Sequence, residues 1–378
     1  MSAKANDLSD ASMNTNISAL PVGKAVEHLS DAFVKIINDN LPLNLLPSIM
    51  LWGAPGVGKS QGVYQLAAGI EAGTGKPVHV TDVRLLLFNP IDLRGIPTSN
   101  EDKTLAIWLK PKLFQMDGSA SVVNILFLDE ISAAPPSVQA AAYQITLDRT
   151  VGEHKLPDNC IVIAAGNRIT DKSVAYKMPK ALANRLCHFE INWDFKSWKE
   201  WAIQNGINEK VIGFLAFRPS YLMMFDTTKD DLAFTTPRSW EMVSNILNHV
   251  SDDINKSYAI IVGCIGIGAA IEFRSWCTVY DKLPDIEKIF DGEPTLVPRQ
   301  TDAMYAVISA MVNYAAKHKN ELDRIANSIQ YAGKLPPDFA TILLKDYMVI
   351  EPDYQHKLMT IPAFSAWLSK NGRYFNHV

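Results

Sequence analysis

The stretch that decides the fold is Gly53-Ala54-Pro55-Gly56-Val57-Gly58-Lys59-Ser60. It is a complete G-x-x-x-x-G-K-[ST] phosphate-loop motif. A short apolar run, Ile49 to Trp52, precedes it, and Gln61 to Ile70 follows with a helical pattern. In such a context the glycines let successive backbone N–H groups point at one anion, and the helix adds its positive end. We therefore expect a phosphate-binding loop rather than a chance glycine-rich turn.

The residues of this loop have separate expected roles. Lys59 would place a charge on the outer phosphates of a nucleotide, and the Ser60 hydroxyl would bind Mg²⁺. The predicted nucleotide-binding residues of the loop are Gly53, Ala54, Pro55, Gly56, Val57, Gly58, Lys59, Ser60 and Gln61.

The composition limits the number of domains and the classes of function that this chain can have. A chain of 378 residues with 48% hydrophobic residues can form one large domain or two to three small ones. The net charge of −4 disfavours a generally basic nucleic-acid surface, although a local basic channel stays open. The four cysteines are far apart, so we expect neither disulfides nor a zinc site, and a cytoplasmic location fits. The polar start, residues 1–18, is expected to be a disordered tail without a signal-peptide core.

Short apolar runs alternate with helical patterns after the loop, which predicts a parallel α/β sheet of five strands. Besides Ile49 to Trp52, the expected strands are Pro77–Val83, Val122–Leu128, Ile161–Ala165 and His188–Ile191. The connection from Arg84 to Ala120 is unusually long. Within it, the segment from Leu93 to Leu109 is expected to form a hairpin with a polar tip, Ser99 to Asp102.

From Trp193 onward the spacing of apolar residues predicts helices only. An apolar stretch from Tyr258 to Ile271 is shorter than the ~20 residues of a membrane span, so we expect a buried helix and no membrane span. Its glycines, Gly263, Gly266 and Gly268, would serve close helix packing. The proline-rich segment Leu283 to Arg299 is expected to be a linker before further helices.

Two acids follow the third apolar run. Asp129 and Glu130 would stand at the carboxyl edge of the sheet, where open α/β sheets bind ligands. There Asp129 can join the Mg²⁺ shell, and Glu130 can accept a proton from an attacking water. Asn167 would follow the fourth strand. From the residues alone, its roles in orienting water and in forming a turn are equally open.

The order of these motifs resembles that of AAA+ ATPases: phosphate loop, Leu128-Asp129-Glu130, Gly166-Asn167, then Ala181 to Arg185 before a short strand. The long insert and Thr236-Pro237-Arg238-Ser239 are similar to the MoxR-like branch. The resemblance covers roughly residues 22–250. It implies an AAA+ domain at 19–194, a helical lid at 195–282 and a helical C-terminal region at 283–378.

The resemblance also implies roles for residues outside the loop. Asn167 would be sensor 1, Arg185 an arginine finger that completes the site of a neighbouring subunit, and Arg238 sensor 2 and a nucleotide contact. The usual Arg-Phe is Arg185-Leu186 here, which leaves the arginine in place. Arg149 and Arg168 stay open as further finger candidates.

We therefore expect a cytoplasmic ATPase that binds ATP or ADP with Mg²⁺. Members of this family act as rings, usually hexamers, and remodel protein partners that often carry a von Willebrand A-type domain. The alternatives are a nucleic-acid-dependent motor on the same core and a nucleotide-gated switch with negligible turnover. The presence of Glu130 disfavours the switch.

Overall fold

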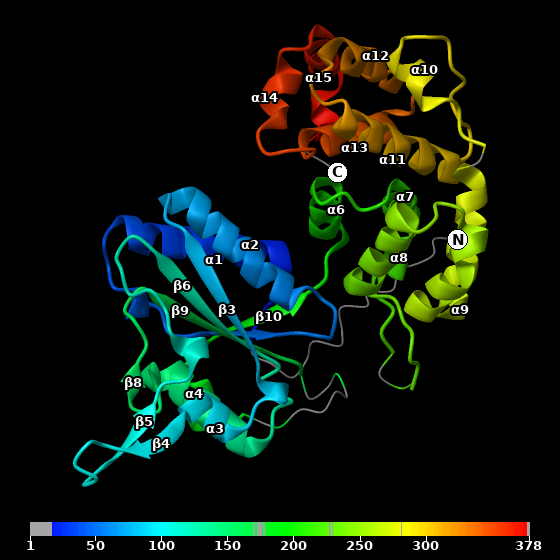
Figure 1. Cartoon of the computed structure of the whole chain (residues 1–378). Coiled ribbons are helices and arrows are strands. Elements are labelled where there is room, and N and C mark those ends of the chain that lie inside the picture. Colours follow the sequence, from blue (N-terminus) through cyan, green and yellow to red (C-terminus); the bar gives the residue numbers. More distant parts are fainter. Residues whose placement is uncertain are drawn as a thin grey trace. The chain divides into compact units, whose positions relative to one another are not determined.

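The structure is a computed structural model, which describes residues 17–168, 171, 176, 178–226, 228, 230–280 and 282–375. The chain divides into two compact units, Met1–Trp193 and Asp194–Val378 (Figure 1). The expected tail lies, up to residue 16, outside the described residues.

A parallel sheet forms the centre of the first unit. Within the described residues it has six strands in the order β1-β10-β2-β9-β6-β3. Their bounds are β1 Ala19–Pro21, β2 Ile49–Trp52, β3 Val78–Arg84, β6 Val123–Asp129, β9 Cys160–Gly166 and β10 Cys187–Asn192. The α/β fold class is as predicted, but five strands was one too few. The missed strand, β1, is three residues long and ends in proline at a sheet edge, so no alternating pattern marks it.

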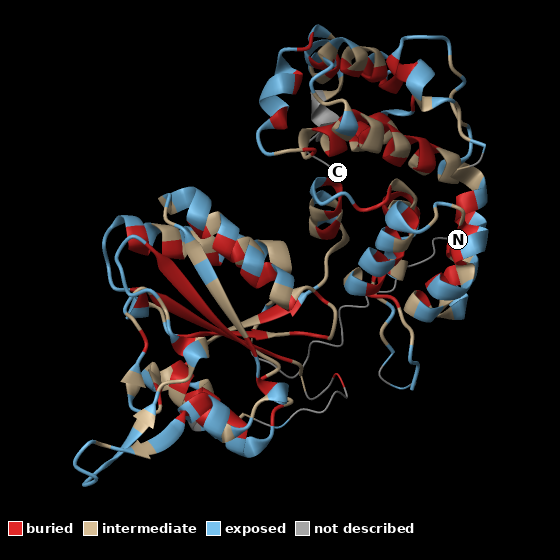
Figure 2. Ribbon diagram, in the orientation of Figure 1, coloured by how far each residue is buried: buried red, intermediate tan, exposed pale blue. Residues whose placement is uncertain are grey.

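Helices cover both faces of this sheet (Figure 1). On one face lie α1 (Val22–Asn38) and α2 (Lys59–Thr74), and on the other lie α3 (Pro90–Arg94) and α4 (Pro136–Asp148). A short helix, α5 (Lys180–Ala183), precedes β10. Phe127 packs in the core toward α1 and α2, whereas Leu128 packs in the core toward α4. Because successive strand residues point to opposite faces, the inner strands are buried on both sides (Figure 2).

The long connection after β3 contains a hairpin. Its strands, β4 (Ile96–Ser99) and β5 (Ala106–Leu109), pair antiparallel. Leu93 and Arg94, which we had placed in the hairpin, belong to α3 instead. Pro90 occupies the first position of that helix, and the Asp92 carboxylate accepts a hydrogen bond from the Asn89 N–H at 2.8 Å, so local capping starts a helix there.

The base of the β4–β5 hairpin is held by a second hairpin, formed by β7 (Thr150–Val151) and β8 (His154–Lys155). His154 Nε2 donates a hydrogen bond to the Trp108 carbonyl oxygen at 2.7 Å. A Cβ atom on Gly152 would lie 2.5 Å from the Arg94 carbonyl oxygen, and one on Gly95 would collide with the Leu109 carbonyl. Only glycine therefore permits the close backbone approach of Gly152 to the end of α3 and of Gly95 to the end of β5.

The regular secondary structure described in the second unit is all helical, with loops between the helices. Its helices are α6 Phe195–Gln204, α7 Glu209–Phe217, α8 Pro237–His249, α9 Ile254–Tyr280, α10 Ile286–Phe290, α11 Thr301–Lys317, α12 Leu322–Ala332, α13 Pro337–Met348, α14 Tyr354–Met359 and α15 Pro362–Phe375. Trp240 and Phe273 pack edge to face with centroids 5.4 Å apart. A buried ion pair of 2.6 Å joins Lys199 of α6 to Asp346 of α13. The helical character agrees with the sequence prediction, while its division into a lid and a C-terminal region stays a prediction.

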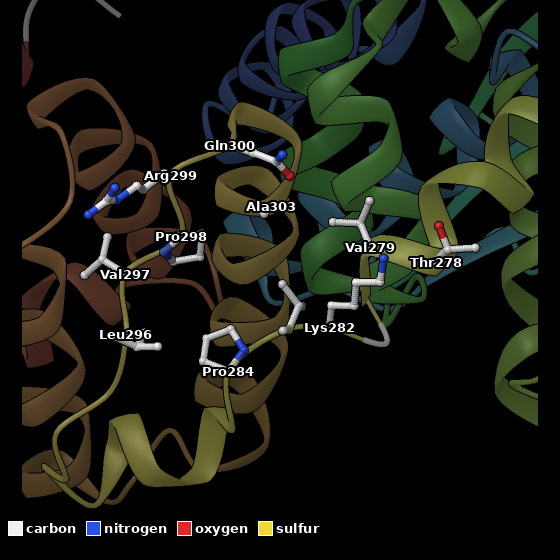
Figure 3. Close-up of a pocket in the computed structure, with 11 residues that line it drawn as sticks. Thr278, Val279, Lys282, Pro284, Leu296, Val297, Pro298, Arg299, Gln300 and Ala303 are labelled. Atoms are coloured by element: carbon white, nitrogen blue, oxygen red, sulfur yellow. The ribbon is translucent and has the colours of Figure 1, made fainter.

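The segment 283–299 is more than the linker we expected, because it contains α10. Proline-rich composition hid this helix, whose start is capped by the Asp285 side chain. The same segment forms one wall of a pocket of about 450 Å³, with Pro284, Leu296 and Pro298 among its lining (Figure 3). The opposite wall includes Val279 at the end of α9.

The apolar stretch of α9 also differs from expectation. Cβ atoms on Gly263 and Gly268 would meet nothing within 4 Å, so these glycines do not serve close packing. Ile260, Ile267 and Ile271 are exposed rather than buried. Among the described residues, this helix passes a length-and-composition test for a membrane span. A single helix of this kind is weak grounds for a span, since core helices pass the same test.

Gly266 has a different role, because it kinks α9 with φ of 77° and ψ of 159°. We expect Gly266→Ala to lower the free energy of unfolding by about 1–3 kcal/mol, since only glycine adopts this conformation without strain. Its Cβ would also lie 2.8 Å from the Ala233 carbonyl oxygen. Urea unfolding measures the change. Gly263→Ala is the control and should be neutral or stabilising, so equal losses in both variants would contradict the role of the kink.

Candidate active site

The phosphate loop connects β2 to α2 in a backbone shape that requires glycine. Gly56 and Gly58 have φ of 75° and 105°. A Cβ on Gly53 would lie 2.6 Å from the Ile191 carbonyl oxygen. The first turn of α2 carries no acidic residue and no side-chain cap, so its N–H groups remain available for an anion.

Lys59 lies at the mouth of the loop, and its side chain is buried. Its Nζ donates hydrogen bonds to the Gly53 and Ala54 carbonyl oxygens at 2.6 and 3.1 Å and to Asn167 Oδ1 at 2.9 Å. This contact follows from the sheet order, because β2 and β9 pair directly and Trp52 stands opposite Gly166. The structure thus brings Lys59 and Asn167 together from residues far apart in the chain.

Ser60 and Asp129 also meet. The Ser60 hydroxyl donates to Asp129 Oδ2 at 2.9 Å, and Asp129 Oδ1 accepts from the Glu130 N–H at 2.8 Å. A hydroxyl and a carboxylate oxygen form the type of donor set that Mg²⁺ prefers, so these residues fit the cation that a phosphate loop implies. Among the described residues, no group of three or more His, Cys, Asp or Glu could hold a metal alone. The remaining ligands would therefore be phosphate oxygens and waters.

Glu130 has a left-handed backbone with φ of 58°. This conformation is uncommon for a residue other than glycine and costs of the order of 1–3 kcal/mol. Neighbouring hydrogen bonds maintain it: the Ile131 N–H donates to the Ala165 carbonyl at 2.9 Å, and the Ala133 N–H donates to the Glu130 carbonyl at 3.0 Å. Strain maintained in this way is typical of functional positions.

The three arginines considered for the finger differ in their partners. Arg168 pairs with Asp171 at 3.0 Å and with the buried Glu190 at 2.6 Å, and Arg149 donates to the Cys160 carbonyl. Both are engaged within their own chain, which disfavours a role in a neighbour's site. Arg185 is exposed and makes no ion pair with any residue that the structure describes. It is therefore the arginine best able to reach another molecule.

Arg238 lies in the second unit, in the first turn of α8, and is exposed. Thr236 caps the helix by accepting from the Ser239 N–H at 3.1 Å. A cation in the first turn opposes the helix dipole by ~0.3–1 kcal/mol, and a bound phosphate would reverse this. Its contact with nucleotide stays a prediction.

Asp82 was not singled out in the sequence. It lies on β3 and accepts a long hydrogen bond of 3.4 Å from the Tyr64 hydroxyl of α2 through Oδ2. Its Oδ1 is buried and has no hydrogen-bond partner among the described residues. Burial, and then the charge of Asp129, raise the pKa of the Asp82 carboxyl. The available signal was strand alternation, since Val78, Val80 and Asp82 share one face and the third is an acid.

Comparison with known proteins agrees with this geometry. Residues 48–188 match the family model described as the ATPase family associated with various cellular activities (AAA). The comparison with curated proteins gives no match.

Similar solved structures include three proteins of low identity. One is a protein described as an ATPase from Cytophaga hutchinsonii, at 16% identity over 81% of this chain and 84% of that chain, with a TM-score of 0.32. Others are PCH-2 from C. elegans, at 13% over 67% of each chain with a TM-score of 0.34, and NtrX from Brucella abortus in complex with ATP, at 13% over 95% and 69% with a TM-score of 0.36. Because their TM-scores are below 0.5, these structures assign no function to this chain.

The family match spans the phosphate loop, Asp129-Glu130, Asn167 and Arg185. Residues 48–188 of this chain are therefore similar to the ATPase domain of that family, and the match supports an ATPase.

Proposed function

We propose that this chain is a cytoplasmic, MoxR-like AAA+ ATPase that assembles into a ring and uses ATP hydrolysis to remodel a protein partner. One observation supports ATP hydrolysis at this site. Lys59 bonds Asn167, and Ser60 bonds Asp129, so the carboxyl ends of β2, β6 and β9 converge on the phosphate loop.

Each side chain has a defined task in this proposal. Lys59 and the loop N–H groups bind the outer phosphates, while Ser60 and Asp129 hold the cation, which neutralises charge on the phosphates when bound. Glu130 takes a proton from the attacking water. Asn167, held beside Lys59, orients that water or contacts the last phosphate.

The site is completed by a second copy of the chain. Arg185 is exposed at the end of the short segment after α5 and has no ion-pair partner among the described residues. An arginine in such a position would reach a neighbour's nucleotide, as in enzymes whose finger is supplied in trans. The ring is expected to be a hexamer, and a von Willebrand A-type protein is a candidate partner.

Partner capture tests the proposal. Glu130→Gln protein in the presence of ATP should retain a protein partner, because hydrolysis no longer releases it. Lys59→Ala, which should not hold ATP, is the matched control and should retain none. ATP turnover that rises with DNA but not with any captured protein would instead favour a nucleic-acid motor.

The β4–β5 hairpin is the proposed partner contact. Ile96 and Leu109 stand opposite each other on its strands and are 62% and 55% exposed, so apolar side chains are available to a protein. Its base contacts the β7–β8 hairpin that follows α4, which gives a physical link to the segment after Glu130.

Replacing residues 98–103 with a short Gly-Ser turn should preserve ATP binding and ring formation while lowering activity on the partner. The tip carries polar residues and lies outside the core, so stability should change little. Partner-stimulated turnover is compared with basal turnover in the same preparation. Unchanged stimulation would exclude the tip as the contact, and Ile96→Ser with Leu109→Ser would then test the apolar face.

A further inference from the structure

Asp82 places a second carboxylate beside the proposed cation ligands. Parallel pairing sets Asp82 opposite Phe127 and Arg84 opposite Asp129. Paired residues of parallel strands share a face, so Asp82 and Asp129 are diagonal neighbours on the face covered by α2. Ser60 and Tyr64 lie four residues apart on α2 and therefore share one side of that helix. The three elements β3, β6 and α2 thus direct four oxygen-bearing side chains toward one location.

Hydrogen bonds among these four side chains leave one carboxylate oxygen, Asp82 Oδ1, without a donor among the described residues. Ser60 donates to Asp129 at 2.9 Å, and Tyr64 donates to Asp82 Oδ2 at 3.4 Å. Asp82 Oδ1 is buried and accepts no hydrogen bond from the described residues. A buried acceptor without a donor is destabilising, and the neighbouring Asp129 carboxylate adds repulsion. The long hydrogen bond from Tyr64 and the charge of Arg84 favour the carboxylate, but neither gives Oδ1 a hydrogen-bond donor among the described residues.

A water of a bound Mg²⁺ would supply such a donor, because the ion usually keeps several waters when it binds through one or two carboxylates and substrate phosphates. We propose that Asp82 is a positioning residue for the cation and that its Oδ1 accepts a hydrogen bond from a water of the Mg²⁺ bound by Ser60 and Asp129. Tyr64 orients the Asp82 carboxylate from the other side. This inference rests on the proposed nucleotide site and adds an outer-shell residue to it.

If Asp82 positions the cation, its substitution should change thermal stability and Mg²⁺ affinity in opposite directions. Asp82→Asn keeps the size of the side chain and removes its charge. Without metal, the variant should unfold at a higher temperature than wild type, because a buried negative charge beside Asp129 is gone. With metal, its Mg²⁺ affinity should fall by roughly 10-fold, the lower end of what outer-shell partners contribute. A residue needed only for the fold would lose stability and leave the cation affinity unchanged.

The experiment uses the full chain and a fluorescent ADP analogue. Binding is titrated with Mg²⁺ from an EDTA-containing buffer, and the midpoint concentration is compared between variants. Thermal unfolding in EDTA gives the metal-free stability. Asp117→Asn is the matched control: the Asp117 carboxylate accepts from the Ser119 N–H at 2.8 Å in the loop before β6. It should lose some stability and keep the wild-type Mg²⁺ midpoint.

Tyr64→Phe is the second variant, since it keeps the ring and removes only the hydroxyl that contacts Asp82. It should shift the Mg²⁺ midpoint in the same direction by a smaller factor. An unchanged midpoint in Asp82→Asn, or a loss of its metal-free stability, would overturn the inference while leaving the nucleotide site intact. Absence of any Mg²⁺ dependence in wild type would overturn the proposed site and this inference together.

Discussion

Glu130→Gln should bind ATP as wild type does and hydrolyse it ~10²–10⁴-fold more slowly, the usual contribution of a general base. This corresponds to about 3–5 kcal/mol of transition-state stabilisation. The amide keeps the size of the side chain but cannot accept the proton of the attacking water. Steady-state phosphate release gives the rate, and equilibrium binding of a fluorescent ATP analogue gives the affinity.

Lys59→Ala separates binding from chemistry in the same assays. The substitution removes the positive charge that attracts the outer phosphates, so the affinity for nucleotide should fall. Equal hydrolysis rates in wild type and Glu130→Gln would remove Glu130 from the mechanism and indicate that Asp129-Glu130 is an ordinary solvated strand end.

Arg185→Ala should bind ATP normally yet hydrolyse it ~10³-fold or more slowly, by analogy with fingers supplied by a partner. That is about 4 kcal/mol of transition-state stabilisation. The exposed guanidinium has no ion pair within the described residues to lose, so the variant should keep its stability. Arg149→Ala is the contrast, because its guanidinium bonds the Cys160 carbonyl and its loss should lower stability more than turnover.

Mixing two inactive variants tests whether the site is shared. Some rings will contain both Arg185→Ala and Lys59→Ala subunits. In them, Arg185 of a Lys59→Ala subunit can reach the nucleotide bound by the intact phosphate loop of an Arg185→Ala subunit. Some activity should therefore return. No recovery in subunits shown to co-assemble, or full specific activity in a proven monomer, would argue against a finger acting in trans.

The sequence predicted the central sheet and the phosphate loop because their physical signals are local. The strands β6 and β9 are almost wholly apolar, as burial on both faces requires. The glycines of the loop are needed for positive φ at Gly56 and Gly58. The strand order then places Asn167 beside Lys59, so residues expected at one sheet edge meet there.

Features that depend on tertiary contacts were missed. In the sequence Asp82 is one polar residue in a strand, and only the position of α2 shows that its Oδ1 accepts no hydrogen bond from the part of the chain that the structure describes. Arg168 could not be set apart from Arg185 until its ion pairs with Asp171 and Glu190 were seen. The short helices α10 and α14 span five and six residues, too few for a helical period to be recognised in the sequence.

The two glycines at the base of the β4–β5 hairpin have a consequence for how this protein can evolve. A side chain at Gly95 or Gly152 would meet backbone, whereas side chains at the tip, residues 101–103, are exposed to solvent. Mutational drift is thus confined to the outer end of the hairpin. A lineage can acquire a new binding partner there without altering the attachment to the ATPase core, so recognition and energy conversion can diversify separately.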